Sequence, residues 1–135
     1  MNGRFITDAD IVRDQEDWGV TGWVSRPSFT GSTSMCVMDV HLQPGGGHAF
    51  HRHPCMEELI YCLDGRAEQW VGREKRILKA GDVAHVPMNE VHGTYNVFDA
   101  PVTFLAVLSP AKFDGPALID VSQEEPWKSL RTRAR

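Results

Sequence analysis

The feature that most constrains this chain is a series of short β-type runs separated by turn residues. From about residue 34 onward, Gly, Pro, Asn or Asp interrupts the apolar pattern every eight to twelve residues or so. Runs of this length and spacing are typical of an antiparallel sandwich or barrel. We therefore expect an all-β fold, a small antiparallel β-barrel, with strands over residues 35–42, 49–53, 58–63, 66–71, 75–78, 83–87, 92–98 and 102–108.

The length and composition fit one domain. The chain has 135 residues, of which 41% are hydrophobic and 24% charged, so it can bury an ordinary core without a disulfide or a metal staple. We expect a single domain over residues 1–135. Within it, the barrel covers about residues 35–108, with an N-terminal arm over 1–34 and a C-terminal tail over 109–135.

Outside the barrel the local signals are weaker. A turn capped by Asp8 is expected over residues 9–14, and a short terminal helix, interrupted near Pro126, over residues 123–130. Residues 17–33 combine aromatic side chains with Gly and Pro, which predicts an extended arm with turns. In a small all-β protein we expect such an arm to lie over an exposed sheet edge or to cross to a partner subunit.

Charge and targeting signals narrow the range of partners. Fourteen basic and eighteen acidic residues give a net charge of −4, the wrong sign for a protein that binds nucleic acid through its phosphates. No segment approaches the roughly 18 apolar residues of a membrane span, so we expect no membrane partner. The first ten residues lack a basic segment followed by an apolar run, which predicts no secretory signal. Three cysteines without Cys-x-x-Cys spacing indicate a reducing, cytoplasmic location.

Histidine and glutamate residues within the β region have the spacing of metal ligands. His51 and His53 are two residues apart, so on a strand both imidazoles project from the same face. Glu58 follows after a probable turn, and His92 lies on a later strand. Three imidazoles and one carboxylate form a mixed nitrogen and oxygen site for one divalent transition metal, namely Fe, Mn, Ni, Co, Cu or Zn, with open positions for water or substrate.

These residues resemble the two motifs of the cupin superfamily. The first motif, Gly-x5-His-x-His-x3-4-Glu-x6-Gly, is matched by Gly45, His51, His53, Glu58 and Gly65. The second, Gly-x5-Pro-x-Gly-x2-His-x3-Asn, is matched by Gly81, Pro87, His92 and Asn96, with Asn89 at the second glycine. Asn is the non-glycine residue that best tolerates a positive φ. The resemblance covers about residues 35–108 and implies a jelly-roll barrel, the double-stranded β-helix, with His51, His53, Glu58 and His92 as metal ligands.

Further residues are weighed by their place on the expected strands. Thr94 and Asn96 follow His92 on the same face and are candidates for contact with the substrate or the metal ligands. His85 is a candidate for proton transfer at the mouth of the pocket. Period-two alternation from Glu58 predicts that Ile60 and Cys62 line the pocket, and that Glu57 points to the opposite face. We expect structural or exposed positions for His41 and His48, core or interface positions for Trp18, Trp23 and Trp70, and a flexible turn at residues 45–47.

The resemblance implies an enzyme but leaves its reaction open. Metal-binding cupins include dioxygenases, decarboxylases, isomerases, lyases and proteins that only bind small molecules, so the ligands do not fix the chemistry. We expect a metal-dependent enzyme that acts on a small hydroxy, keto or carboxylate metabolite, with dioxygenase-type chemistry favoured. Alternatives are a redox-neutral isomerase or lyase and a non-catalytic binding protein. Small cupins of this kind usually pair, so we expect a homodimer.

A second resemblance supports the isomerase alternative. The small cupins of pectin breakdown, which act on unsaturated uronates, carry a stretch similar to Glu-Lys-Arg-x-Leu-x-Ala-Gly-Asp at residues 74–82. They also have a His-Gly pair like His92-Gly93, and a Ser-Pro or Thr-Pro segment like Ser109-Pro110. They often carry Gln where this chain has Glu58.

Overall fold

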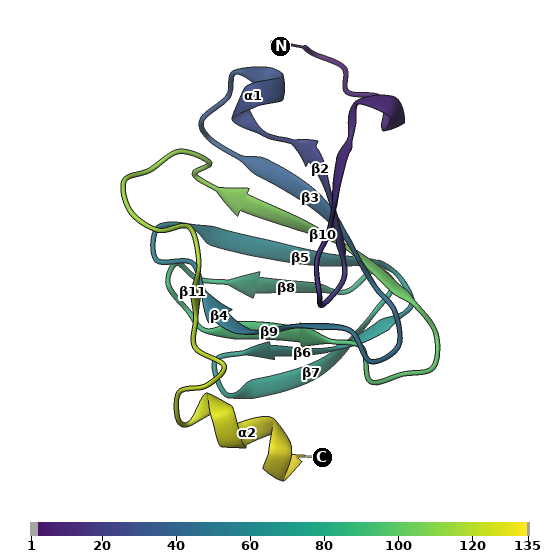
Figure 1. Ribbon diagram of the computed structural model, residues 1–135, viewed down its shortest axis with the longest axis vertical. Coiled ribbons are helices and arrows are strands. Elements are labelled where there is room, and N and C mark those ends of the chain that lie inside the picture. The colour runs from purple at the N-terminus through teal and green to yellow at the C-terminus, as the bar shows by residue number, and fades with distance from the viewer. Residues whose placement is uncertain (1–2, 135) are drawn as a thin grey trace.

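Two antiparallel sheets form most of the molecule (Figure 1). The computed structural model describes residues 3–134, with side chains up to Arg131. Its strands are β1 (Val12–Gln15), β2 (Val20–Ser25), β3 (Cys36–Leu42), β4 (Gly47–Arg52), β5 (Glu57–Asp64), β6 (Arg66–Val71), β7 (Glu74–Lys79), β8 (Val83–Val86), β9 (His92–Tyr95), β10 (Val102–Ser109) and β11 (Ile119–Asp120). The helical elements are η1 (Asp8–Asp10), α1 (Pro27–Thr30) and α2 (Trp127–Ala134). No described helix is long and apolar enough to span a membrane.

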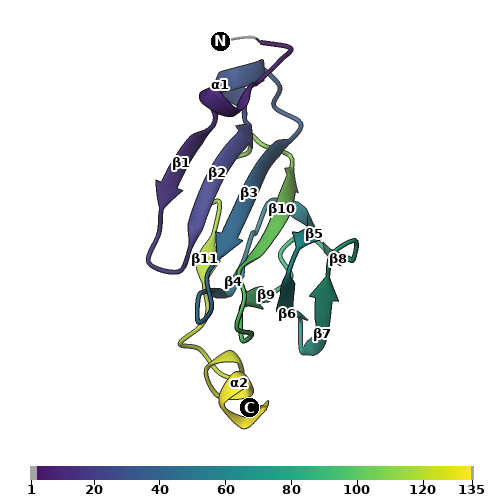
Figure 2. The same cartoon turned by 90° about the vertical axis from the view of Figure 1, so that its right-hand side faces the viewer.

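The strand order explains how the sheets enclose a core. One sheet has the order β1-β2-β3-β10-β5-β8 and the other β11-β4-β9-β6-β7, all in antiparallel pairs (Figure 2). From β3 to β10 the chain alternates between the sheets except at β6 and β7, which form a hairpin in the five-stranded sheet, and this order is that of a double-stranded β-helix. The all-β prediction is therefore confirmed, although the ladders form two sheets and do not close into one barrel among the described residues.

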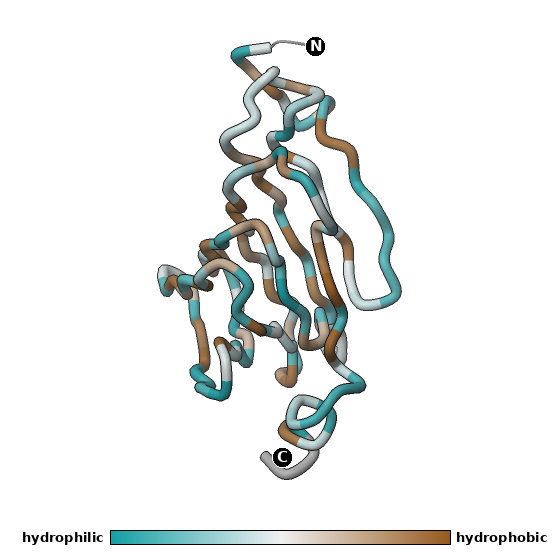
Figure 3. The backbone as a smooth tube through the Cα atoms, turned by 90° about the vertical axis from the view of Figure 1, so that its left-hand side faces the viewer, coloured by the Kyte–Doolittle hydropathy of each residue, from teal (hydrophilic) through white to brown (hydrophobic). Residues whose placement is uncertain are grey.

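Side-chain alternation sets which face of each strand is buried. On β5, Glu58, Ile60 and Cys62 are buried while their neighbours are exposed. On β10, Phe104 and Ala106 follow the same rule and face them across a regular register. Figure 3 shows apolar segments along the strands, interrupted by hydrophilic residues. The apolar inward faces form the main core, which also includes Val40, Leu42, Val86, Val102 and Leu108.

The eight runs predicted from the sequence correspond to β3 through β10, with ends that differ by a few residues. The prediction for residues 9–14 was wrong beyond the first turn. Only η1 is helical there, and Val12–Gln15 instead pairs with β2. Because β1 has no buried residue, its sequence carries no apolar alternation that could have identified it. The short strand β11 was not predicted from the sequence either, because two residues are too few to show a hydrophobic alternation.

The N-terminal arm is more regular than expected, but it lies where the sequence analysis put it. Within residues 17–33, β2 pairs with β3 and α1 follows it, so the arm covers the edge that β3 would otherwise expose. At the other end, the predicted helix over residues 123–130 begins later, at Trp127, directly after Pro126. Proline lacks the N–H that a helix interior requires, so a start after it is physically favoured.

Helix α2 is attached to the five-stranded sheet by a buried carboxylate. Glu68 on β6 accepts hydrogen bonds from Trp70 Nε1 at 3.0 Å and from Arg131 Nε at 2.7 Å. The Arg131 guanidinium also lies 3.6 Å from the centroid of the Tyr95 ring. Burial raises the pKa of Glu68, but these hydrogen bonds and the positive charge of Arg131 outweigh it, so the net effect is a lowered pKa.

We predict that Glu68→Gln lowers the free energy of unfolding by about 1–3 kcal/mol at pH 7, since it leaves Arg131 without its anionic partner. Because the folded-state pKa of Glu68 is lowered, this stabilisation is present above the unfolded-state value of about 4.3 and is lost as pH falls below it. The measurement is urea unfolding of both proteins with chelator from pH 7 to pH 3. Glu74→Gln, in the exposed pair with Arg76, is the control and should change stability by less than about 0.5 kcal/mol. A difference for Glu68→Gln that is constant with pH would contradict the prediction.

Candidate metal centre

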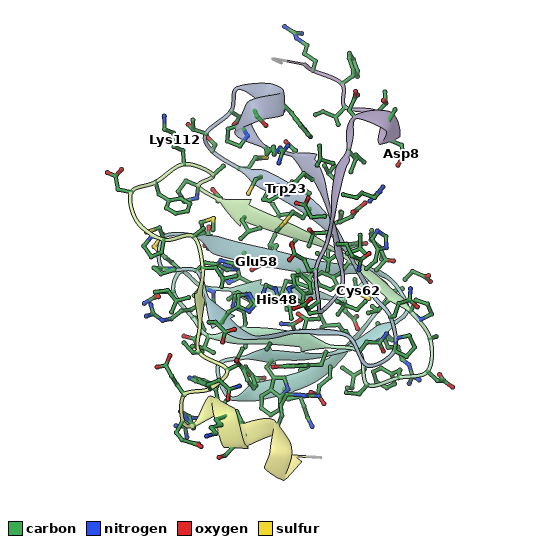
Figure 4. The ribbon with its side chains drawn as sticks, in the orientation of Figure 1. Asp8, Trp23, His48, Glu58, Cys62 and Lys112 are labelled. Atoms are coloured by element: carbon green, nitrogen blue, oxygen red, sulfur yellow. The ribbon has the colours of Figure 1, made fainter. Side chains whose placement is uncertain are left out.

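Four side chains from three parts of the fold converge between the sheets. One ligand-type atom from each of His51, His53, Glu58 and His92 lies within 4.8 Å of the others, and all four residues are buried. Figure 4 shows Glu58 between the sheets, with the label of His48 beside it. The sequence analysis named these same four residues as candidate ligands, and the fold brings them together.

Strand pairing explains how the cluster forms. His51 on β4 is paired with His92, the first residue of β9, so their side chains share one face of the five-stranded sheet. His53 follows the end of β4, and its own carbonyl oxygen accepts a hydrogen bond from the Asn89 amide at 3.0 Å. Glu58 reaches the cluster from β5 in the opposite sheet. Asn89 has a φ of +67°, in the region that the cupin motif assigns to glycine and that Asn tolerates.

Each imidazole of the cluster is oriented by a backbone carbonyl. His51 Nδ1 lies 2.6 Å from the Ala49 oxygen, His53 Nδ1 2.8 Å from the Ala117 oxygen, and His92 Nδ1 3.0 Å from the Glu90 oxygen. A carbonyl can only accept, so each Nδ1 carries the proton. In a neutral imidazole the other ring nitrogen, Nε2, then has a free lone pair, the form in which histidine binds a metal.

The Nε2 atoms face a carboxylate, and this arrangement requires positive charge. His92 Nε2 lies 2.9 Å from Glu58 Oε1, and His53 Nε2 lies 3.1 Å from the same oxygen. Two lone pairs at this distance repel unless a proton or a metal ion lies between them. Metal–ligand bonds of about 2.1 Å at right angles place neighbouring donors about 3 Å apart. The donor types, their spacing and their free lone pairs therefore fit one divalent transition ion.

Electrostatics around the cluster agree with this reading. Burial raises the pKa of Glu58, but in the metal-free protein hydrogen bonds from the protonated Nε2 atoms of His53 and His92 reverse the effect and leave the pKa far below its usual range. Burial lowers the pKa of His53, yet the contacts with Glu58 raise it overall. Burial and neighbouring imidazoles hold the pKa of His51 well below its usual value. The carboxylate thus stays ionised and attracts a cation, while His51 stays neutral, as a metal ligand must.

A cavity of about 540 Å³ opens beside the cluster. Its walls come from the inner faces of both sheets, the β1–β2 hairpin and the segment before β11. The lining comprises Asp14, Glu16, Trp18, Thr21, Trp23, Cys36, Met38, Val40, Gly47, His48, Ala49, His51, His53, Met56, Glu58, Ile60, His92, Thr94, Phe104, Ala106, Leu108, Ala117, Leu118 and Asp120. All four cluster residues are in this lining, so a bound ion would be accessible to a small molecule.

The sequence analysis missed His48 as a cavity residue. The β4–β9 register shifts between His48 and His51, so His48 pairs with Thr94 while His51 pairs with His92. This bulge turns two residues three apart to the same face, whereas a regular strand would turn them to opposite faces. The His48 ring stacks between Trp18, at a centroid distance of 4.0 Å, and His51, at 3.7 Å. Burial lowers the pKa of His48 to about 4, so the ring is neutral near pH 7.

The other candidates occupy different surroundings. Thr94 lines the cavity and its hydroxyl donates to Gln69 at 2.6 Å. Asn96 does not line it; its amide donates to the Leu42 and Ala100 carbonyls at 3.0 and 2.8 Å, which ties the end of β3 to the loop before β10. His85 is exposed and lies 3.3 Å from Glu57, outside the cavity.

The remaining side chains were predicted with mixed success. Ile60 lines the cavity as expected, whereas Cys62 is buried in the core but is not part of the lining. Trp70 lies in a second core cluster, as predicted. Trp18 and Trp23, expected only as core or interface residues, also line the cavity. His41 is partly exposed and contacts Thr103. Gly47 of the predicted turn is the first residue of β4, and the turn itself is centred on Pro44 and Gly45.

Comparison with known proteins agrees with the fold and the motifs. The pectin degradation protein KdgF of Dickeya dadantii is 29% identical over 105 residues, which cover 77% of this chain and 94% of that protein. An uncharacterized conserved protein with a double-stranded β-helix domain from Klebsiella pneumoniae superposes with a TM-score of 0.69 at 25% identity, over 87% of this chain and 96% of that one. The oxalate decarboxylase of Lactobacillus farciminis, solved as a formate complex, gives a TM-score of 0.73 at 25% identity, over 85% of this chain and 35% of that one.

A family model described as the cupin domain matches residues 38–108, more than half of the chain, including all four cluster residues. The chain belongs to the cupin family.

Proposed function

We propose that His51, His53, Glu58 and His92 hold one divalent transition ion, and that this cupin is a metal-dependent enzyme acting on a small oxygenated metabolite. The observation that carries the proposal is the arrangement of proton donors on the cluster. All three Nδ1 atoms are engaged by backbone carbonyls, which leaves the Nε2 lone pairs free, and those of His53 and His92 are directed at a buried carboxylate.

The charge of the site indicates the kind of ligand. A divalent ion held by three neutral imidazoles and one carboxylate keeps about one net positive charge, which favours oxygen atoms of hydroxyl, keto or carboxylate groups. Such an ion supplies Lewis acidity or, if it is iron, the capacity to activate dioxygen. The chain contributes a largely apolar cavity and two groups beside the ligands, the neutral His48 imidazole and the Thr94 hydroxyl.

Dioxygenase-type chemistry is the first candidate reaction, supported by the largely apolar walls of the cavity beside the metal ligands. A redox-neutral isomerase or lyase is the second, supported by the likeness to a pectin degradation protein over nearly its whole length. A non-catalytic binding protein is the third. We also propose that Thr94 contacts the substrate, and we keep the cytoplasmic location as a prediction, supported by three cysteines that form no disulfide.

We predict that the protein binds about one cobalt or zinc ion per chain. His51→Ala and Glu58→Gln should each lower the metal affinity at least about 100-fold, because each removes a ligand atom or its charge. Metal content after dialysis and calorimetric titration measure the effect, and circular dichroism shows whether each variant is folded. His85→Ala, a histidine outside the cavity, is the control and should bind as the unchanged protein does. Folded variants of the four residues that bind metal normally would refute the site.

The reaction type is tested with iron-loaded protein and a panel of catechols, diketones, flavonols and unsaturated uronates. Dioxygenase-type chemistry predicts about one O₂ consumed per substrate converted, and no conversion under nitrogen. Conversion of a uronate under nitrogen would select the isomerase or lyase instead. Recovery of every bound compound unchanged would select the binding protein.

We propose that two copies of the chain form a homodimer, and apolar side chains exposed on one sheet face support this. Leu59, Tyr61 and Leu63 on β5 are 40–43% exposed, and Val83 on the adjacent strand β8 is 50% exposed. We predict twice the mass of the chain by light scattering at about 50 μM, and the mass of one chain for Tyr61→Glu. Ile77→Glu, on a different strand and 48% exposed, should leave the dimer intact. A single-chain mass for the unchanged protein would contradict the proposal.

A further inference from the structure

The walls of the cavity carry acidic groups, and their basic side chains are all histidines. Among residues 3–131, no Lys or Arg is part of the lining. The exposed charged members of the lining are the three carboxylates Asp14, Glu16 and Asp120. Asp14 accepts a hydrogen bond from Trp23 Nε1 at 3.1 Å, and hydrogen bonds from Ser122 lower the pKa of Asp120. Neither carboxylate has a basic partner within ion-pair distance among the described side chains.

Two arginines lie on neighbouring segments but outside this wall. Arg13 is paired with Asp8 and Asp39 at 3.1 and 2.9 Å. Arg26 lies over the rings of Trp23 and Phe29, in an adjoining cavity of about 220 Å³, and its Nε is buried without a hydrogen-bond partner. The ring of Trp23 is part of both cavity walls. A test of anion binding therefore has to include a variant of Arg26.

The interior of the cavity is apolar and aromatic. Met38, Val40, Ile60, Phe104 and Leu108 of the six-stranded sheet line it, and none of them can form a hydrogen bond with a substrate. Trp18 and Trp23 add two large rings at the side of the arm. A volume of about 540 Å³ is within the usual range for ligands with one or more rings, far more than a two-carbon acid fills.

These features restrict the charge of the substrate. With Glu58 as a ligand, the bound ion offers about one net positive charge, which a catechol neutralises by losing one proton to the solvent as its two adjacent oxygens bind. A uronate bound through its one carboxylate would place its hydroxyl groups against the apolar side chains of the lining, where they lack hydrogen-bond partners. The second carboxylate of a dicarboxylate would leave an excess negative charge without a cationic partner in the lining.

We infer that the substrate is a neutral aromatic compound whose two adjacent oxygens, as in a catechol or an aromatic diketone, bind the metal, and that it is not a uronate or a small dicarboxylate. This inference rests on the proposed metal site. Four protein donors leave two positions of a six-coordinate ion for the two oxygens. The ring occupies the apolar part of the cavity beside Trp18 and Trp23.

The test is binding to cobalt-loaded protein, measured by calorimetry and by quenching of tryptophan fluorescence. The probes are 2,3-dihydroxynaphthalene, galacturonate and oxalate. Metal content is measured first, so a protein that takes up no metal overturns the proposed function and is distinguished from a failure of the substrate class alone. We expect the naphthalenediol to bind at least about 10-fold more tightly than either anion. Tighter binding of galacturonate or oxalate to the metal-loaded protein, or no binding of the diol, would overturn the inference.

Charge variants distinguish the effect of the cavity lining on anion binding from the effect of the metal. Glu16→Lys adds a cation to the lining and should tighten galacturonate binding several-fold relative to binding of the diol. Glu74→Lys makes the same change on exposed β7, outside the cavity, and should alter neither. Arg26→Gln should also leave all three affinities unchanged. A loss of anion binding in Arg26→Gln, together with anions that bind the unchanged protein more tightly than the diol, would reveal a carboxylate subsite and contradict a neutral substrate.

Discussion

The metal centre depends on one interaction, the close approach of the Nε2 atoms of His53 and His92 to a single oxygen of buried Glu58. Backbone carbonyls fix the proton of each ring on Nδ1, so the atoms that meet at the centre are all electron-pair donors. Such a cluster is stable only with positive charge between its members. Protons can supply that charge in the metal-free protein, consistent with the raised pKa of His53 and the lowered pKa of Glu58. A divalent ion would supply it with bonds to every donor at once.

The two facing sheets make this approach possible. The five-stranded sheet supplies the imidazoles, from β4, β9 and the turn after β4, and the six-stranded sheet supplies the carboxylate, from β5. The bulge in β4 then adds His48 to the same wall, and the β1–β2 hairpin adds Trp18 beside it. The result is a polar cluster at one side of a largely apolar cavity. The few polar groups can orient a substrate, while the rest of the substrate contacts apolar side chains.

Most of the architecture followed from local patterns in the sequence. The eight central strands were predictable because turn residues separate short β-type runs. The period of two along β5 then predicted correctly that Ile60 and Cys62 are buried on the same face as Glu58. The four-residue cluster was predictable because its spacing follows from strand geometry and matches a family motif. In contrast, β1 is exposed throughout and had no apolar signal, and β11 is held by pairing with β4 from a distant part of the chain.

The site residues that sequence reasoning missed share one cause. His48 faces the cavity because of a register shift between two strands, which a rule of period two cannot contain. Trp18 and Trp23 reach the cavity through the position of the arm, a tertiary feature without a local signature. Asn96 fits the motif and yet caps loop carbonyls, since β9 ends at Tyr95 before the alternation reaches it.

X-ray absorption spectroscopy of the cobalt-loaded protein tests the central claim most directly, because it reports the atoms bound to the metal. The account predicts three imidazole nitrogens and carboxylate oxygen at about 2.1 Å, with loss of one imidazole in His92→Ala. A coordination sphere that contains sulfur, or that lacks imidazole, would contradict it.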